Sequence, residues 1–464
     1  MSVSTPLGGH DLVERALSYA TVSDTVVIVA DISEASLRWA GNSMTTNGVG
    51  DSRSWTVVSI VRDGTAARVG TVSSTSMDPD DVAGVVAAAE DAARAAQPAT
   101  DAMPLVEGAP TPDSGWGDVP LRKGIDVFDS VVPGLARGFD GADALYGFAH
   151  HTVRTVWLGT STGVRRRVVE PVGSLEINGK RGGLSGGASA WVGTGTRDFR
   201  DIDLDASLAE LTRRLDWSAR TVDLPAGRYE TILPPSAVAD LMIDLLWSMD
   251  GRGAQEGRTA LSAPGGGTRV GEVLGHLGLT LYSDPSENGL EYAPFVVTGS
   301  SSDAVSVFDN GMDAGRTDWI RDGAITSLAY PRSAAAEFGV TPTVPGDNLV
   351  MVGGAGGSVD DLVARTERGL LLTTLWYIRE VDPTTMLLTG LTRDGVYLVE
   401  DGRVTAAVNN FRFNESPLDI LRRATEAGTT VPTLPREWSD WFTRAAMPPM
   451  RIPDFHMSSV SAAQ

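Results

Sequence analysis

The stretch from Gly369 to Leu421 reads GLLLTTLWYIREVDPTTMLLTGLTRDGVYLVEDGRVTAAVNNFRFNESPLDIL, and its pattern of strands and turns decides the fold. Two apolar runs, Gly369–Arg379 and Gly395–Glu400, lie on either side of a turn expected at Asp382-Pro383. Proline has a fixed φ and no N–H to donate, so the chain is expected to leave the sheet there. The pattern predicts two β-strands joined through this turn.

A second turn, Glu400-Asp401-Gly402, reverses the chain into a further strand at Arg403–Val408. Asp-Gly between apolar runs is a strong hairpin signal, because glycine accepts the positive φ that the turn needs. A helix is expected from Ser416, where Leu418 and Leu421 lie three residues apart. The stretch therefore predicts an antiparallel meander followed by a short helix.

This order of strand, VDPTT turn, strand, DGVYLVEDGRV hairpin and helix resembles the C-terminal domain of the TldD/PmbA family, once called modulators of DNA gyrase. The resemblance implies an intracellular metallopeptidase complex that trims unfolded peptides. It also implies two related types of subunit, a TldD type and a TldE (PmbA) type.

The first part of the chain alternates predicted helices and strands, which is typical of an α+β layer. The helices are expected at Asp11–Ala20, Val82–Ala96 and Asp205–Leu215, and the strands at Asp24–Asp31, Trp55–Arg62, Ala67–Ser73, Ala144–Thr160 and Arg165–Ile177. The segment RWAGNS, residues 38–43, and the Gly-rich NGVGDS, residues 47–52, are expected to connect two of these strands. This order and the RWAGNS segment resemble the N-terminal domain of the same family.

The composition changes at Leu224-Pro225-Ala226-Gly227, ahead of a predicted strand at Tyr229–Leu233 and a helix at Ala237–Trp247. We expect an α+β protein of two domains. Residues 1–224 would form an N-terminal α/β domain with an antiparallel sheet and flanking helices, and residues 225–464 a mostly β domain. Residues 97–120, rich in Pro, Gly and Asp, are expected to be a surface loop or linker.

The charge and composition exclude several classes of protein. The chain has 59 acidic and 38 basic residues and a net charge of −21, which disfavours binding to nucleic acid, since phosphate backbones attract the opposite charge. It contains no cysteine, so it has neither a disulfide framework nor a thiolate ligand. No apolar run is long enough to span a membrane and no signal peptide is recognisable, so a cytoplasmic protein is expected.

The catalytic subunits of the resembled family carry HExxxH on the helix after the domain-opening strand, where two histidines share a zinc ion and the glutamate acts as base. Here that helix reads SAVADLMIDLLWSMDGRGAQEGRTAL, and the motif would fall near Leu245–Asp250. The helix contains no histidine. The resemblance is therefore to the TldE (PmbA) type, and no catalytic and no metal-binding residue is carried over from it.

The five histidines of the chain do not replace the missing motif. None is followed by Glu, and His150-His151 lies in a predicted strand, where neighbouring side chains point to opposite faces. A solvated or hydrogen-bonded histidine is the simpler interpretation of each. A metal site assembled from distant histidines and carboxylates stays open at this point.

Asp250, Glu256 and Arg258 are the candidate site residues, expected to line a shared cavity or to contact a partner. They are polar residues in a Gly-containing segment at the end of the helix that lacks the motif. The alternative is an ordinary solvated loop.

These observations predict a non-catalytic, TldE/PmbA-like subunit of a heteromeric zinc metallopeptidase that processes unstructured peptides. A TldD-type partner would supply HExxxH and the zinc, and this chain would bind no metal itself. Self-association as a homodimer in isolation stays open. Two alternatives remain: an independent metallopeptidase with unconventional metal ligands, and a non-enzymatic peptide-binding or scaffold protein.

Overall fold

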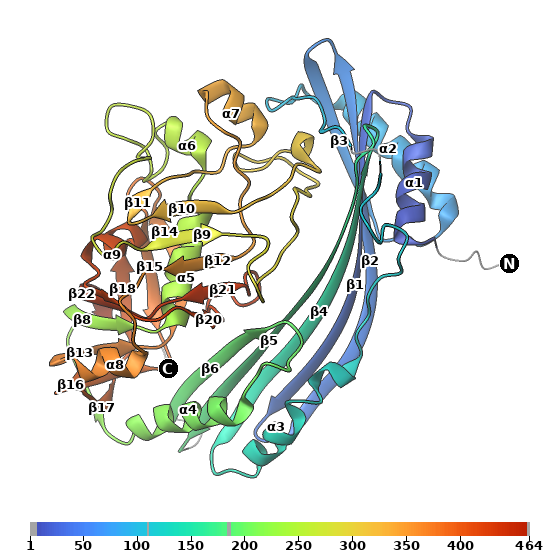
Figure 1. The fold of residues 1–464 in the computed structure, drawn as a ribbon. Helices are drawn as coiled ribbons and strands as arrows, with labels where there is room; N and C mark the ends of the chain where they lie inside the picture. The colour runs from blue at the N-terminus through green and yellow to red at the C-terminus, as the bar shows by residue number, and fades with distance from the viewer. Residues whose placement is uncertain (1–6, 109–110, 183–186, 462–464) are drawn as a thin grey trace.

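One six-stranded antiparallel sheet, in the order β3-β2-β1-β4-β5-β6, organises the N-terminal half of the chain. The computed structural model describes residues 7–108, 111–182 and 187–461. The strands are β1 (Asp24–Ala40), β2 (Met44–Asp63), β3 (Ala66–Ser74), β4 (Ala144–Thr160), β5 (Arg165–Arg181) and β6 (Ala188–Thr196). Figure 1 shows this sheet as a long curved wall, with the C-terminal half on its concave side.

Helices cover the other face of this sheet. They are α1 (Gly9–Tyr19), α2 (Val82–Ala95), α3 (Val132–Phe139) and α4 (Leu204–Trp217). Because side chains alternate along a strand, β1 serves both faces. Val27 and Val29 pack in the core under α1 and α2, whereas Ile28 shares a core with Phe295 and Phe308 of the C-terminal half. The sheet is therefore a shared wall between two layers.

The first hairpin is longer than the sequence pattern predicts. β1 continues to Ala40 and pairs with β2 along its whole length, so the Gly-rich residues 47–52 are strand and the expected connection there is wrong. Residues 44–52 are exposed, and an exposed strand does not need the apolar alternation on which the prediction relied. The actual connection is the short turn of Gly41, Asn42 and Ser43, in which Gly41 and Asn42 both have positive φ.

The predicted loop at residues 97–120 contains no helix or strand in its described residues, 97–108 and 111–120. It is fastened to the N-terminal sheet, because the Gly108 N–H donates to the Thr162 carbonyl at 3.0 Å and the Asp113 N–H donates to the Arg165 carbonyl, also at 3.0 Å. The loop therefore packs as part of the N-terminal half.

Two sheets and five short helices make up the C-terminal half. The larger sheet has the order β14-β15-β18-β22-β8-β13-β16-β17-β7, with β19 added beside β22, and the smaller has the order β11-β10-β9-β12-β21-β20. Its strands are β7 (Thr221–Val222), β8 (Gly227–Leu233), β9 (Thr280–Ser283), β10 (Thr317–Arg321), β11 (Ala324–Ile325), β12 (Leu349–Val352), β13 (Arg368–Leu372), β14 (Leu375–Asp382), β15 (Leu387–Thr392), β16 (Val396–Glu400), β17 (Arg403–Val408), β18 (Phe411–Glu415), β19 (Glu426–Ala427), β20 (Val431–Thr433), β21 (Ala445–Met447) and β22 (Met450–Val460). Its helices are α5 (Pro235–Trp247), α6 (Gly251–Gln255), α7 (Arg332–Phe338), α8 (Val359–Ala364) and α9 (Pro417–Arg423).

The predicted run Gly369–Arg379 is two strands, so its reading as one strand is wrong. Thr373 and Thr374 separate β13 from β14, which lie at positions six and one of the sheet order. In a flat sheet six strands would span about 24 Å, but two linking residues reach only about 11 Å. The sheet must therefore curl until β13 and β14 meet at a corner. The hairpin between β16 and β17 forms as predicted, with positive φ at Asp401 and Gly402.

Helix α5 lies at the centre of the C-terminal half. Pro235 suits its first turn, where the missing N–H would have no helical partner. The surrounding core includes Trp319 of the smaller sheet and Phe413 of the larger sheet, together with Leu241 and Leu245 of α5 itself. A helix buried on all sides is expected to be apolar throughout, which makes any charged residue on it notable.

The fold class is α+β, as the sequence predicts. The sheets separate strands β1–β6 from β7–β22, while the division into residues 1–224 and 225–464 stays a prediction. No helix in the described part of the chain is both long and apolar enough to cross a membrane.

Candidate functional site

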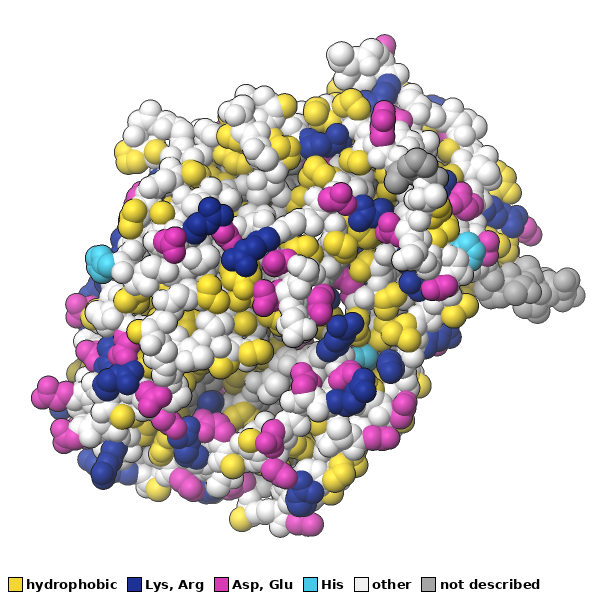
Figure 2. All heavy atoms as spheres, in the orientation of Figure 1, with side chains coloured by type: hydrophobic (Ala, Val, Ile, Leu, Met, Phe, Trp, Pro, Cys, Tyr) yellow, Lys and Arg dark blue, Asp and Glu magenta, His cyan; other side chains and the backbone are white. Residues whose placement is uncertain are grey.

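A cleft separates the concave face of the N-terminal sheet from the loops of the C-terminal half. It holds three adjoining cavities of about 470, 220 and 180 Å³. All three are lined by Glu170, and Arg154, Asp347 and Arg444 each line two of them. Figure 2 shows acidic and basic side chains gathered around the hollow between the two halves. The cleft is the main concave feature that both halves build together.

Strands β4 and β5 form the N-terminal wall of the cleft. Phe148, His150, Thr152 and Arg154 alternate along β4 and line the 470 Å³ cavity. Arg154 pairs in register with Glu170 of β5. Because of the two-residue period, the intervening residues of β4 face the helices on the other side. A regular sheet thus presents one straight row of mixed aromatic and polar side chains to the cleft.

Glu170 connects the two walls. Its carboxylate is buried, and it accepts a hydrogen bond from Arg154 Nη1 at 3.2 Å and pairs with Arg444 Nη2 at 3.5 Å. The Ala293 N–H also donates to it at 3.2 Å. Arg444 in turn pairs with Asp347 at 2.5 Å. Glu170 thus has two cations and a backbone donor around it, and its contacts with Arg444 and Ala293 link the N-terminal sheet to the C-terminal half.

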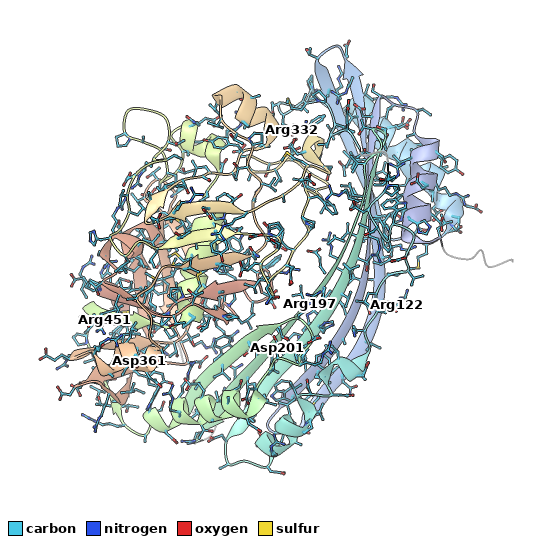
Figure 3. The ribbon with its side chains drawn as sticks, viewed as in Figure 1. Arg122, Arg197, Asp201, Arg332, Asp361 and Arg451 are labelled. Carbon is cyan, nitrogen blue, oxygen red and sulfur yellow. The ribbon has the colours of Figure 1, made fainter. Side chains whose placement is uncertain are left out.

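A second contact crosses the smallest cavity. Arg197, just beyond β6, pairs with Glu291 of the C-terminal half at 3.4 Å, and Asp201 lines the same cavity. Figure 3 shows Arg197 and Asp201 on the side of the sheet that faces the C-terminal half. The cleft is therefore bridged by ion pairs at two levels.

The segment 434–442, which we call the bridging segment, ties α5 to the cleft wall. The Glu437 N–H donates to Asp240 Oδ1 on α5 at 2.9 Å, and Trp438 Nε1 donates to the Asp240 carbonyl at 2.9 Å. On the other side, Arg436 and Ser439 contact the two carboxylate oxygens of Glu176 on β5, at 2.8 and 3.0 Å. The packing of α5 is thus linked through a few residues to the cleft.

Two acids lie on α5 itself, one helical turn apart. Asp240 is fully buried, and burial raises its pKa well above the ordinary range. Burial, together with the nearby charge of Glu437, raises the pKa of Asp244 to about 7. Within the described residues, Oδ2 of each acid is buried without a hydrogen-bond partner. Asp240 therefore favours the protonated form at neutral pH, whereas Asp244 is near the midpoint of its titration there.

This donor set does not fit the zinc site expected of a catalytic relative. Such sites use imidazole nitrogens and a carboxylate around an open position. Helix α5 offers two carboxyl groups and no imidazole, and Asp240 Oδ1 already accepts a backbone hydrogen bond. Across residues 7–108, 111–182 and 187–461 no cluster of three or more His, Asp or Glu side chains could hold a metal ion.

The three candidate residues from the sequence lie around α6. Asp250 is its N-cap and accepts from the N–H groups of Arg252 and Gly253 at 3.0 and 2.8 Å. Arg258 is exposed and pairs with Glu256 at 2.9 Å and with Asp303 at 2.8 Å. None of the three lines the cavities of the cleft. Their contact with a partner stays a prediction.

The neighbouring histidines point to opposite faces, as the strand pattern predicts. His150 faces the cleft and stacks on Phe148, with ring centres 5.5 Å apart. His151 is buried on the other face, where its Nε2 lies 2.9 Å from the Arg197 carbonyl, and burial lowers its pKa. They cannot act together on one ligand.

The cleft residues come from distant parts of the chain, so no local sequence pattern indicates them. Arg154, Glu170 and Arg444 form no local motif, and nothing in one sequence reveals that they meet. Asp240 and Asp244 could have been singled out from the sequence, since two acids in an otherwise apolar helical run are unusual. The N-cap role of Asp250 could also have been predicted from its place before a short helix.

Comparisons with known proteins give one family model and several structures of similar fold. A family model described as the PmbA/TldA metallopeptidase C-terminal domain matches residues 226–459. A search of curated proteins found no match. A search of solved structures found TldE from Thermococcus kodakarensis at 16% identity and a TM-score of 0.76, covering 96% of this chain and 98% of that one.

Two further structures, each described as a candidate modulator of DNA gyrase, are similar. One, from Thermotoga maritima, has 14% identity and a TM-score of 0.73, with 93% of this chain and 95% of that chain covered. The other, from Bacteroides thetaiotaomicron, has 15% identity and a TM-score of 0.74, with 97% and 98% covered. At these identities the likeness is one of fold, over nearly the whole length of both chains.

Proposed function

The chain belongs to the PmbA/TldD family of metallopeptidase-related proteins, and from this premise we propose that it is a TldE-type, non-catalytic subunit of a heteromeric zinc peptidase. Its partner would be a TldD-type chain that carries HExxxH and the zinc. The complex would cleave unstructured peptides, with zinc activating water for attack on the peptide carbonyl.

The composition of α5 carries this proposal. The helix that follows the first long strand of the family domain has two carboxyl groups and no imidazole, and its Asp240 is buried among apolar side chains. A protonated acid in an apolar core is a poor metal ligand, because binding would require it to lose its proton there. The chain thus keeps the family architecture while its own helix offers no zinc site.

The cleft supports a role in handling peptide. One wall is a regular sheet that presents alternating polar and aromatic side chains, and the other is built of loops from the C-terminal half. Ion pairs at Glu170 and at Arg197 cross between them. A folded domain is far larger than cavities of 180 to 470 Å³, whereas an extended segment is suited to them.

The test uses the purified chain alone and mixed with an HExxxH-bearing family member from the same genome. Zinc is measured by mass spectrometry, assembly by size-exclusion chromatography with light scattering, and cleavage with an unstructured peptide. We expect a stable mixed complex, with zinc and cleavage in the mixture and neither in this chain alone. A partner with both motif histidines changed to alanine is the control, and should assemble without cleaving.

Other outcomes point to the alternatives. Stoichiometric zinc with chelator-sensitive cleavage by this chain alone would overturn the proposal in favour of an independent metallopeptidase. Failure to assemble with any such partner, with peptide binding retained, would favour a non-enzymatic peptide-binding protein.

A further inference from the structure

Arg38 is an arginine of the cleft whose charge has no carboxylate partner among the described residues. It lies near the end of β1, opposite Phe148 of β4, and its guanidinium carbon is 4.7 Å from the centre of the Phe148 ring. The side chain is exposed and lines the 470 Å³ cavity. A cation held over an aromatic ring keeps its hydrogen-bond donors free for a ligand.

The other two arginines of this cavity are already engaged. Arg154 and Arg444 both contact Glu170, and Arg444 also pairs with Asp347. The chain has a net charge of −21, so an arginine that faces a cavity and has no carboxylate partner of its own is a specific feature. It provides an anion-binding point inside an acidic protein.

An aromatic surface adjoins this cation. The rings of Phe148 and His150 stack at 5.5 Å with an angle of 15° between their planes. Trp441 of the bridging segment lines the same cavity and is 79% exposed, the highest exposure of any tryptophan in the described chain. A tryptophan left uncovered in a cavity can bury much apolar area once a ligand side chain covers it.

Asp440 sets the limits of the ligand. It also lines this cavity and is exposed, with no cation partner in the part of the chain that the structure describes. A multiply charged anion, such as inorganic phosphate, would be repelled by it more strongly than a single carboxylate. The cavity instead suits a molecule with one carboxylate, an apolar side chain and otherwise neutral groups.

We propose that this cavity binds an extended peptide through one carboxylate on Arg38 and one large apolar side chain against Trp441 and the Phe148–His150 stack. The choice of a peptide rests on the proposed function, while the carboxylate and the apolar side chain follow from the cavity. An arginine binds carboxylate through two parallel N–H donors, so the contact gives orientation as well as affinity.

Calorimetric titration of the full chain tests this site. The probes are a five-residue unstructured peptide that ends in phenylalanine, as the free acid and as the C-terminal amide, and an amidated version with one glutamate. We expect the free acid to bind at least about tenfold more tightly than the amide, as for a charge-assisted contact. The Glu-containing amide shows whether the carboxylate that binds Arg38 can come from a side chain as well as from the C-terminus of the peptide.

Variants assign the contacts. Arg38→Gln should abolish the preference for the acid and leave the binding of the amide unchanged, whereas Trp441→Ala should weaken both peptides alike. Arg403→Gln, at an exposed arginine of β17 away from the cleft, is the matched control and should change neither. Each variant is first checked for an unaltered unfolding midpoint.

Three results would overturn the site: no binding of any peptide, equal binding of all three peptides by the parent chain, or a preference for a carboxylate that survives Arg38→Gln. The measurement needs no partner and no zinc, so it is separate from the test of the proposed function. If the chain binds the peptide but does not assemble with a partner, the subunit role is contradicted and the peptide site is supported. If it assembles but does not bind the peptide, the site is contradicted and the subunit role is supported.

Discussion

Arg451 and the acids of α5 show two ways in which this protein buries an ionisable group. Arg451, on β22 and labelled in Figure 3, is 8% exposed and has four acceptors. It donates to Glu230, Glu426, the Thr366 hydroxyl and the Leu362 carbonyl, at 2.6, 3.0, 2.5 and 2.8 Å. Its charge is fully compensated by groups of the chain.

The α5 acids have no such shell. Asp240 accepts one backbone N–H through Oδ1, Oδ2 of Asp240 and of Asp244 is orphaned among the described groups, and the nearby Glu437 adds like charge. The protein compensates the buried cation with acceptors, and the buried acids with protons. Stability at the first site therefore depends on neighbours, and at the second on pH.

The largest expected effect comes from removing the compensated cation. Arg451→Met removes the buried partner of Glu230 and Glu426. It should lower the free energy of unfolding by about 3 kcal/mol, the low end for a buried pair, because Glu230 is partly exposed and Glu426 keeps its pair with Arg365. Urea denaturation followed by circular dichroism measures it. Arg403→Met, at an exposed arginine, should cost less than about 0.5 kcal/mol, and a similar loss in both variants would show that the compensation at Arg451 is unimportant.

The second prediction concerns pH. Asp244 has a pKa of about 7 in the fold, above its value in the unfolded chain, so the folded state binds the proton more tightly. Its contribution is fully present below about pH 4 and is lost as pH rises through 7, with a difference of roughly 3 kcal/mol between pH 4 and 8. Asp244→Asn cannot ionise and should be the more stable form at pH 8.

Urea midpoints at several pH values measure this effect. Asp223→Asn, at an exposed acid with no ion pair in the described structure, is the control and should keep the parental pH dependence. If Asp244→Asn also keeps it, the acid is not the titrating group.

The smallest expected effect concerns the influence of Glu437 on the pKa of Asp244. The charge of Glu437 is the second cause of the raised pKa of Asp244, after burial. Glu437→Gln removes that charge, so the pKa of Asp244 should fall and the loss of stability should begin at lower pH, by an amount worth less than about 1 kcal/mol. The midpoint on the pH axis is the readout, because it does not depend on the total stability of the variant. A midpoint that stays in place or moves to higher pH would contradict this coupling.

Local patterns predict the regular elements well. β4 and β17 have the predicted bounds, because each is a run of strand-forming residues between turn residues. The patterns fail where context decides: residues 47–52 are strand because β1 pairs with them, and the break at Thr373-Thr374 reflects the curling of a whole sheet. One-dimensional periodicity carries no information about either cause.

The candidate site is harder to predict from the sequence than the fold. The absence of histidine from α5 can be read directly from the sequence, whereas the contact of Asp250 with a partner stays a prediction beside its role as an N-cap. Cleft residues such as Arg38, Glu170 and Trp441 are scattered over the chain, and only the curvature of the sheet and the course of the bridging segment bring them to one cavity. Their chemistry emerges from tertiary structure alone.

The pairing of β8 with β22 has a further consequence. Gly227 lies opposite Met457 and Leu233 opposite Met450, so the first and last long strands of the C-terminal half are neighbours. Because these ends adjoin, a short linker would join β22 to β8 in a circular permutant of this half with new ends at the Asp401-Gly402 turn, and the other strand pairings would be kept. Such a rearrangement would leave α5 and its acids in the same surroundings.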